Sequence, residues 1–387
     1  MSPTRNQSFW ISAGELSGDM HAAKLVSELA AARPSLQFIG MGGPHLRAEK
    51  AFKGLFRIED LSVMGLTEVL LQLPRILSLI GRIKTALAEH RPAALIVVDA
   101  PSFHFRIIKA ARELSIPVYY YISPKVWAWK PKRALFIKDT VRRLISILPF
   151  EVDFYKHFGM DIDYVGNPLV DMVDWERIKD IPPTPGKIGL FPGSRMKEIT
   201  SLVPEFGKAA RILREKKPNL SFHMVRAPGI AESTLKNLWP KDVPLVMLPP
   251  DDRYAFMRSC EMTIAASGTV TFEAALTGTP TIAVYKVSPL TFAIGKLFVT
   301  IPYASLSNII LDKELFPELL QGNCDGGNLA AKALEWLDPL PGTDPLDAVR
   351  QELAVFGSRM GEPGAAKRAA NIILDDFDLL HKTQGLP

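Results

Sequence analysis

The fold of this chain is decided by one stretch, Met262-Thr-Ile-Ala-Ala-Ser-Gly-Thr-Val-Thr-Phe-Glu-Ala-Ala-Leu-Thr-Gly-Thr-Pro280, which is followed by Thr281-Ile-Ala-Val-Tyr285. Its pattern predicts a short apolar strand, a Ser-Gly-Thr corner, a helix of good helix formers, a Gly-Thr-Pro stop and a second strand. Strands that alternate with helices in this way pair in parallel. The stretch therefore predicts an α/β fold.

The corner of this stretch suits a phosphate group. Ser267, Gly268 and Thr269 stand where a strand ends and a helix begins, so free backbone N–H groups and the positive helix end meet there. Gly268 allows the backbone to approach a ligand closely. Glu273 follows one turn into the helix and is placed to accept hydrogen bonds from ribose hydroxyls. Spacing alone leaves open the alternative of an ordinary capped turn that binds no ligand.

Length and composition predict a globular protein of two domains. The 387 residues exceed one ordinary core, and the hydrophobic fraction is 47% with 22% charged residues. We find no run of about 18 apolar residues and no signal peptide, and so expect neither a transmembrane span nor secretion. Cys260 and Cys324 lack the spacing of metal ligands, which favours a reducing cytoplasm and argues against structural zinc. The net charge of +5 is mild.

Short β-branched or aromatic runs alternate with helical patterns along the chain, which predicts parallel sheets with helices on both faces. The alternation breaks at Ile181-Pro-Pro-Thr-Pro-Gly186, which continues neither a helix nor a central strand. We predict two doubly wound, Rossmann-like domains that face a cleft, with ligands at the carboxyl ends of their strands. The predicted domains are residues 1–175 and 186–345, followed by a helical tail of residues 346–387 whose docking site the sequence does not give.

Two loops of the first domain favour a sugar ligand. The loop Ala13-Gly-Glu-Leu-Ser-Gly-Asp19 precedes a helix but lacks the lysine of a P-loop and the spacing of a dinucleotide-binding loop. Its acceptors Glu15 and Asp19 suit sugar hydroxyls better than phosphate. The loop Gly40-Met-Gly-Gly-Pro44 is a second place where a ligand can approach the backbone closely. The predicted acceptor or sugar contacts of the two loops are Gly14, Ser17, Gly42 and Gly43.

Asp99 is the candidate general base. It follows the strand Ala94–Val98, and a carboxylate at the mouth of a buried parallel strand is well placed to take a proton from a ligand. The alternative is a carboxylate that caps the next helix or pairs with a basic neighbour. His104 is predicted to be a packed ring or, if it is functional, to orient Asp99 or a hydroxyl group.

Two further stretches predict contact with lipid. Residues 66–83 are apolar on nearly every face of a helix, which indicates either a deeply buried helix or one in contact with lipid. Pro74 is expected to kink or to divide it. The stretch Pro124-Lys-Val-Trp-Ala-Trp-Lys-Pro-Lys-Arg133 interleaves two tryptophans with four cations, which suits an anionic membrane surface. A single-stranded nucleic-acid platform and a core position for the tryptophans are the alternatives, and no other nucleic-acid module accompanies the stretch. The predicted membrane or acyl contacts are Leu66, Val69, Leu73, Trp127, Trp129, Lys130, Lys132 and Arg133.

The second half supplies another wall of the predicted phosphate site. The strand Lys187–Phe191 runs into Pro192-Gly-Ser-Arg195, a turn whose N–H groups and Arg195 side chain suit a phosphate. The pair Asp161-Ile-Asp163 has the Asp-x-Asp spacing of metal-dependent glycosyltransferases. Its neighbourhood indicates a surface strand end instead, and we predict no metal site.

These motifs occur together in a recognisable order. They are Ala13-Gly-Glu-Leu-Ser-Gly-Asp19, Gly40-Met-Gly-Gly43, Ser62-Val-Met-Gly65, Asp99-Ala-Pro101, Ser123-Pro-Lys-Val-Trp-Ala-Trp129, Leu148-Pro-Phe-Glu151, Pro192-Gly-Ser-Arg195 and Ser267-Gly-Thr269 with Glu273. The chain closely resembles the lipid-A-disaccharide synthases, inverting glycosyltransferases of the GT-B type, over roughly Phe9 to Leu320. The first loop and the Trp-Ala-Trp segment are specific to that family, whereas many GT-B enzymes share the Ser-Gly-Thr corner with its glutamate.

The resemblance implies a reaction. The family joins UDP-2,3-diacylglucosamine to 2,3-diacylglucosamine 1-phosphate (lipid X), and the products are a β(1→6)-linked disaccharide 1-phosphate and UDP. The resemblance makes Asp99 the base for the acceptor's 6-hydroxyl and Glu15 a group that positions a sugar. It also implies that no metal or other cofactor is needed, because backbone amides, a helix N-terminus and Arg195 neutralise the leaving diphosphate. The implied donor-binding residues are Gly193, Ser194, Arg195, Ser267, Gly268, Thr269, Glu273 and Asn308.

The sequence departs from the family pattern in three places. Ser102 and His104 stand in the Asp99 loop where the family commonly has Asp and Asn. Gly166-Asn-Pro168 replaces Gly-His-Pro, and Leu306-Ser-Asn308 replaces Leu-Pro-Asn. The candidate base and the phosphate-site residues are kept, so we expect activity. The effect of Ser102 and His104 on that activity, and the preferred acyl-chain length, remain open.

The acylated substrates imply that the protein is peripheral on the inner face of the inner membrane. We expect no nucleic-acid partner, because the sequence has no other nucleic-acid module. By resemblance alone we also expect a homodimer, with or without exchanged C-terminal segments. Two rival functions share the predicted architecture. A UDP-N-acetylglucosamine 2-epimerase would act on its soluble substrate without a lipid acceptor, and a UDP-sugar-binding regulator would bind the nucleotide sugar without turnover.

Overall fold

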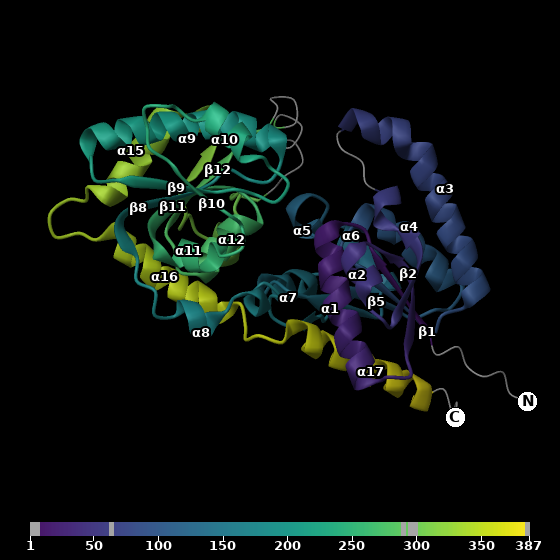
Figure 1. The fold of residues 1–387 in the computed structure, drawn as a ribbon. Coiled ribbons are helices and arrows are strands. Elements are labelled where there is room, and N and C mark those ends of the chain that lie inside the picture. Colours follow the sequence, from purple (N-terminus) through teal and green to yellow (C-terminus); the bar gives the residue numbers. More distant parts are fainter. Residues whose placement is uncertain (1–7, 62–65, 288–291, 293–300, 384–387) are drawn as a thin grey trace, which may run out of the picture. The chain divides into compact units, whose positions relative to one another are not determined.

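The computed structural model describes residues 8–61, 66–287, 292 and 301–383, which fall into two compact units (Figure 1). Unit 1 comprises Met1–Asp171 and Glu362–Pro387, and unit 2 comprises Met172–Gly361. The predicted break at residues 175–186 therefore lies within unit 2. The predicted tail of residues 346–387 is not one body, because the structure divides it between the two units.

Unit 1 is built on sheet A, in which the described residues form seven parallel strands in the order β3-β2-β1-β4-β5-β6-β7. Every residue of β1, β4 and β5 is buried, as expected for central strands that helices cover on both faces. The strands are β1 (Ser8–Ala13), β2 (Gln37–Gly42), β3 (Phe52–Arg57), β4 (Ala94–Val98), β5 (Val118–Tyr121), β6 (Arg143–Ser146) and β7 (Asp163–Tyr164). The helices are α1 (Leu16–Ala32), α2 (Pro44–Ala48), α3 (Leu66–His90), α4 (Pro101–Glu113), α5 (Val126–Trp129), α6 (Arg133–Thr140), α7 (Phe150–Lys156) and α17 (Ala365–Thr383).

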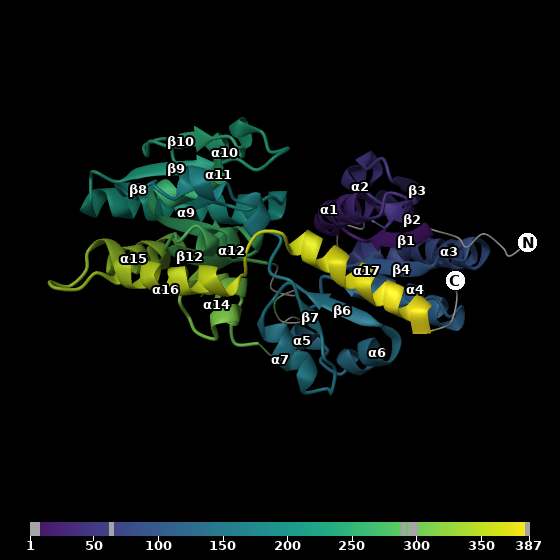
Figure 2. The same ribbon diagram turned by 90° about the horizontal axis from the view of Figure 1, so that it is seen from below.

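The last helix, α17, docks on unit 1 beside α1 (Figure 2). Its Phe377 ring packs edge-on against Phe9 of β1, with ring centres 4.8 Å apart. Its Asp376 carboxylate accepts a hydrogen bond of 3.0 Å from the Tyr119 hydroxyl and pairs with Arg142. These contacts give the docking site that the sequence leaves open.

Helix α3 runs without a break through Pro74, where the sequence predicts a kink or a new helix. The predicted lipid contacts Leu66 and Val69 lie outside the side chains that the structure describes. Leu73 and Leu77 are exposed, whereas Leu79 and the residues that follow it on the same face are buried. Within the described part of the chain, every helix is too short or too polar to cross a bilayer.

Unit 2 repeats the architecture on sheet B, whose described strands run in the order β10-β9-β8-β11-β12-β13. Helices α9, α10 and α15 cover one face of the sheet, and α11, α12 and α16 cover the other (Figure 1). The strands are β8 (Thr184–Phe191), β9 (Ser221–Val225), β10 (Val246–Leu248), β11 (Cys260–Ala266), β12 (Thr281–Tyr285) and β13 (Glu318–Leu320). The helices are α8 (Trp175–Ile178), α9 (Met196–Lys216), α10 (Glu232–Leu238), α11 (Arg253–Ser259), α12 (Thr269–Leu276), α14 (Leu306–Leu311), α15 (Gly326–Leu337) and α16 (Pro345–Arg359).

Each sheet has one point where the strand order reverses. In sheet A it lies between β1 and β4, which pair through Ala13 and Val98 at their carboxyl ends. In sheet B it lies between β8 and β11, which pair through Phe191 and Ala265. Doubly wound sheets bind ligands at such points, because the two loops leave toward opposite faces. The loops after β1 and β4, and those after β8 and β11, are therefore the candidate sites of the two units.

Candidate active site

The loops after β1 and β4 are packed together in unit 1. A Cβ atom on Gly14 would clash with the Ala100 side chain, so the first loop needs a glycine to pass the second. A Cβ atom on Gly18 would lie 3.7 Å from the Asp99 Cβ, which places Asp99 beside the first turn of α1. The structure thus brings the loop that carries the predicted residues Gly14, Glu15 and Ser17 next to the predicted base.

Asp99 has an unusual backbone. Its φ is +53° and that of Ala100 is +45°, a left-handed conformation that costs a side-chain-bearing residue roughly 1–3 kcal/mol. The Asp99 carbonyl oxygen accepts one hydrogen bond of 2.7 Å from His104 Nδ1 and one of 2.8 Å from the Tyr120 hydroxyl. The partly exposed carboxylate has no hydrogen-bond partner among the described residues. The main chain is held firmly while the carboxylate stays available to a ligand.

His104 is the anchor of this loop. Because Nδ1 donates to a carbonyl, Nε2 is unprotonated and accepts a hydrogen bond of 3.0 Å from the Ser12 hydroxyl. The ring is fully buried, and burial lowers the pKa of His104 to about 4. The imidazole is therefore neutral at pH 7 and in one tautomer. His104 has both roles that the sequence allows, because its ring packs in the core and also holds the Asp99 backbone.

The predicted sugar loop after β2 has a structural role. The Asp19 carboxylate accepts hydrogen bonds from the backbone N–H groups of Gly43 at 2.5 Å and His45 at 2.8 Å, which caps helix α2. A Cβ on Gly43 would lie 2.6 Å from Asp19 Oδ2, and one on Gly42 would lie 2.7 Å from Leu46. Both glycines are buried. Gly42, Gly43 and Asp19 thus have partners within the fold, and their contact with a sugar stays a prediction.

In unit 2 the loops after β8 and β11 lie side by side at the switch point. Arg195 is 82% exposed and pairs with Glu198 at 3.0 Å, a surface ion pair of small energy that leaves the guanidinium free to turn toward an anion. A Cβ on Gly268 would meet no atom within 4 Å. The protein's own packing thus does not require that glycine, and the open space suits a ligand that approaches the backbone.

The predicted ribose acceptor, Glu273, is buried and already paired. Arg253 Nη2 donates to Glu273 Oε1 at 2.8 Å, and the Tyr254 hydroxyl donates to the same oxygen at 3.0 Å. Burial raises the pKa of the Tyr254 hydroxyl, and the Glu273 charge adds to that rise. Sequence reasoning missed Arg253 and Tyr254, because no spacing at the start of α11 marks them. A ribose that binds Glu273 would have to share its carboxylate with Arg253 and Tyr254.

The predicted donor contact Asn308 is also paired within the fold, so its role in binding stays a prediction. Its Nδ2 donates to the Phe316 carbonyl at 2.8 Å and to Glu318 Oε1 at 2.9 Å, and its Oδ1 accepts from the N–H groups of Leu315 and Phe316. Both donors and both acceptor positions of the amide are in use. The residue ties α14 to β13.

The two tryptophans of the predicted membrane stretch have opposite environments. Trp127 is only 8% exposed and its indole N–H donates to Glu151 at 2.8 Å, so the prediction of a lipid contact is wrong for this residue. Burial raises the pKa of Glu151 to about 7. Trp129 is 37% exposed, with Lys130 Nζ 4.7 Å from its ring centre. The exposed aromatic and cationic side chains of the stretch are Trp129 and three lysines, Lys125, Lys130 and Lys132.

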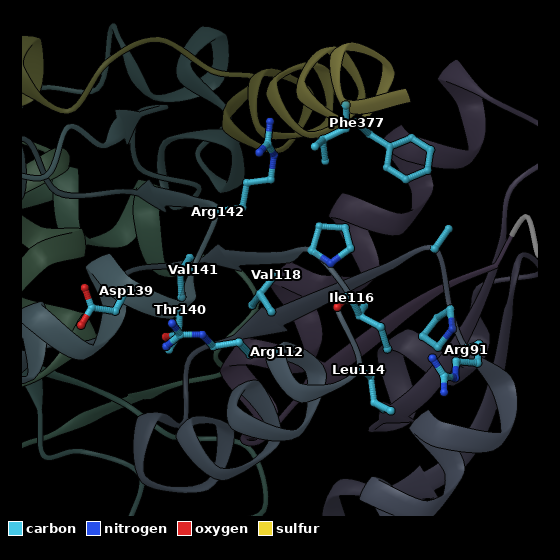
Figure 3. A pocket seen from close by; sticks show the side chains of 15 residues that line it. Arg91, Arg112, Leu114, Ile116, Val118, Asp139, Thr140, Val141, Arg142 and Phe377 are labelled. Carbon is cyan, nitrogen blue, oxygen red and sulfur yellow. The ribbon is translucent and has the colours of Figure 1, made fainter. Parts of the chain in front are cut away.

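A cavity of about 630 Å³ lies at the opposite ends of the sheet A strands (Figure 3). Its walls come from the segments that precede β4, β5 and β6 and from α17, and they include Arg91, Arg112, Val118 and Phe377. None of the predicted site residues lines it. The cavity is therefore separate from the candidate site at the carboxyl ends of the strands.

Solved structures of similar fold define the class of protein. UDP-GlcNAc 2-epimerase from Neisseria meningitidis, bound to UDP-GlcNAc, has a TM-score of 0.59 and 13% identity, and the match covers 95% of this chain and 99% of that one. UGT2 of Phytolacca americana, complexed with UDP-2fluoro-glucose and pterostilbene, has a TM-score of 0.60 and 12% identity over 96% and 99% of the two chains. Two parallel-sheet units with candidate sites at their switch points make this an α/β protein of the GT-B fold.

Sequence comparison identifies the family. A family model described as Lipid-A-disaccharide synthetase matches residues 9–341. The lipid-A-disaccharide synthase of Myxococcus xanthus (strain DK1622) is 38% identical over 375 residues, 94% of this chain and 96% of the relative. That of Syntrophus aciditrophicus (strain SB) is 37% identical over 373 residues, with the same shares covered. The chain belongs to the lipid-A-disaccharide synthase family, which favours a glycosyltransferase over an epimerase.

Proposed function

We propose that the chain transfers 2,3-diacylglucosamine from UDP-2,3-diacylglucosamine to the 6-hydroxyl of 2,3-diacylglucosamine 1-phosphate. The products are the β(1→6) lipid A disaccharide 1-phosphate and UDP, in the biosynthesis of lipid A. Family membership supports the reaction. The structural observation that carries the proposal is Asp99, a carboxylate without a described partner at the switch point of sheet A, on a backbone that two donors hold.

The proposed acceptor chemistry is inverting. The acceptor's 6-hydroxyl oxygen forms a bond to C1 of the donor sugar as the bond from C1 to the UDP oxygen breaks on the opposite side. Asp99 takes the hydroxyl proton in the same step. Its strained and anchored backbone restricts the positions of the carboxylate, which lowers the entropic cost of alignment. Glu15 stands at the N-cap position of α1 without a side-chain capping bond, and it is proposed to bind a sugar hydroxyl.

The proposed donor chemistry needs no metal ion. The UDP that leaves gains negative charge, which the backbone N–H groups after β8 and β11 and the Arg195 guanidinium are proposed to neutralise. The open space around Gly268 and the exposure of the Arg195 side chain support this assignment. Glu273 is proposed to bind the ribose while Arg253 keeps its carboxylate oriented. The predicted donor contacts from these loops are Gly193, Ser194, Arg195, Ser267, Gly268, Thr269 and Glu273.

We further propose that the protein acts as a peripheral protein on the inner face of the inner membrane. Its substrates carry acyl chains, and Trp129, Lys130 and Lys132 present an exposed aromatic ring beside cations in unit 1. Leu73 and Leu77 of α3 add exposed apolar surface. A homodimer is proposed from the family resemblance alone.

The direct test is to incubate the purified chain with the acylated UDP-sugar and lipid X and to measure UDP and disaccharide. We expect both products in equal amounts. Folded protein that releases neither would contradict the proposal. Two parallel reactions separate the rivals, because conversion of UDP-N-acetylglucosamine without acceptor indicates an epimerase, and nucleotide-sugar binding without products indicates a regulator.

A further inference from the structure

Arg133 has a guanidinium group that the fold holds in place but does not pair. Its Cζ lies 5.3 Å from the ring centre of Phe105 and 5.2 Å from that of Trp129, so aromatic rings on two elements fix the group. Its Nη1 atom is buried and has no hydrogen-bond partner among the described residues. A buried donor without a partner destabilises the fold, and the missing acceptor is the physical reason to look for a ligand.

Arg133 lies on a helix that packs against the helix following the proposed base. Phe105 belongs to α4, which begins directly after the Asp99 loop, and Arg133 begins α6. The hydroxyl of Tyr120 donates to the Asp99 carbonyl. Burial raises the pKa of Tyr120 well above its usual value, the Asp99 charge adds to the rise and the Arg133 charge opposes it.

The charges around Arg133 favour an anion. Lys130 lies over the same Trp129 ring, with Nζ 4.7 Å from its centre. No carboxylate of the described residues forms a salt bridge with Arg133 or Lys130. An arginine whose plane is fixed by stacking offers a fork of N–H donors that matches phosphate oxygens. The occupant is thus expected to be a phosphate group or another oxyanion.

We propose that Arg133 binds the phosphate monoester of the acceptor sugar and so orients its 6-hydroxyl toward Asp99. The inference rests on the proposed function for the identity of the ligand. It gives Arg133 a substrate phosphate in place of the general membrane contact that the sequence predicts. A membrane headgroup offers the same phosphate chemistry, and the experiment below separates the two sources.

The first measurement compares KM for the acceptor in Arg133→Gln, Arg133→Lys and wild type, each with acceptors that carry or lack the 1-phosphate. We expect Arg133→Gln to raise KM for the phosphorylated acceptor about 30-fold and KM for the other acceptor less than about 2-fold. Lysine should recover part of the loss, because it keeps the charge without the fork. Arg112→Gln, which removes an exposed arginine from the opposite ends of the strands, should change neither value. Equal losses on both acceptors would refute the inference.

The second measurement does not depend on turnover. We expect glucosamine 1-phosphate, without vesicles or nucleotide, to show a ³¹P shift on binding to wild type and Arg112→Gln but not to Arg133→Gln. This result supports the phosphate site even if the protein makes no disaccharide, whereas no binding to wild type overturns it. A loss of binding to phosphatidylglycerol vesicles in Arg133→Gln, with an unchanged acceptor KM, would assign Arg133 to the membrane and also overturn it. Thermal unfolding verifies that each variant is folded.

Discussion

The switch points of the two sheets are built in opposite ways. In sheet A the Asp99 loop is strained and held by buried donors, among them a neutral His104. In sheet B the corner at Gly268 has open space around it, and Arg195 is largely exposed. A group that takes a proton needs a fixed position, whereas groups that bind and release a diphosphate need room and exchangeable contacts. The proposed function assigns the reacting hydroxyl to unit 1 and the leaving group to unit 2, in keeping with this difference.

The largest effect is expected from a substitution at the rigid switch point of sheet A. Asp99→Asn keeps the size of the side chain but removes the proton acceptor. We expect kcat to fall about 10³-fold and donor affinity to change less than about 3-fold, because a general base contributes roughly 10²–10⁴-fold. Steady-state kinetics and titration with UDP measure the two quantities. Comparable losses in both would make Asp99 a structural carboxylate.

The substitution Arg195→Gln tests the open switch point of sheet B. The side chain is 82% exposed, so its replacement should leave thermal unfolding unchanged. We expect affinity for UDP to fall about 10- to 100-fold, because a hydrogen bond to a charged group is worth roughly 1.5–3 kcal/mol. Lys197→Gln, an exposed lysine on the same helix, is the matched control. An unchanged UDP affinity would remove Arg195 from the donor site.

His104→Leu tests whether the anchor fixes Asp99. We expect kcat to fall about 10-fold with little change in donor affinity, because the Asp99 carbonyl keeps only the Tyr120 donor. The variant should also be less stable at pH 7 by about 2 kcal/mol, since two buried hydrogen bonds are lost.

The same variant has a pH signature. The pKa of His104 falls from 6.5 to about 4 on folding, so below pH 6.5 the unfolded chain binds a proton that the folded chain does not. Wild type should therefore lose stability as the pH falls toward 4, whereas the leucine variant should not show this loss. The difference in unfolding free energy between wild type and His104→Leu, measured by urea unfolding, should therefore narrow by about 2 kcal/mol between pH 7 and pH 5. A constant difference would show that His104 is not neutral in the fold.

The smallest expected effect compares the two tryptophans. Trp127→Phe removes the indole donor to Glu151 and should lower the unfolding free energy by about 1–3 kcal/mol. Trp129→Ala should leave stability within about 0.5 kcal/mol and weaken binding to anionic vesicles about 3-fold. Vesicle sedimentation and urea unfolding separate the two. Equal vesicle binding by wild type and Trp129→Ala would exclude this surface as the membrane contact.

Periodicity predicted the architecture correctly where the backbone follows local rules. The opening stretch forms β11, α12 and β12, with its glycine corner at the junction. The two-domain α/β fold and the family also follow from the order of such motifs. The domain ends were less predictable, because the last helix is assigned to unit 1 by contacts such as that of Phe377 with Phe9.

The site residues show where such reasoning ends. Trp127 and Trp129 share one motif, yet only Trp127 meets the Glu151 carboxylate that α7 supplies. Asn308 stands in a family position, yet its amide is saturated by the chain around β13. Arg253 carries no motif and still holds Glu273. In each case the deciding partner comes from another element of the fold.

The sequence by itself determined the strand–loop–helix order, the glycine corners and the family, because backbone conformation and hydrophobic pattern depend mainly on neighbouring residues. Only the tertiary structure decided which polar groups are already paired and which are open to a ligand. Asp19, Asn308 and Trp127 are paired within the fold, whereas the Asp99 carboxylate and the Arg133 guanidinium lack a described partner. The physical reason is that hydrogen-bond partners are chosen by the packing of elements that lie far apart in the chain.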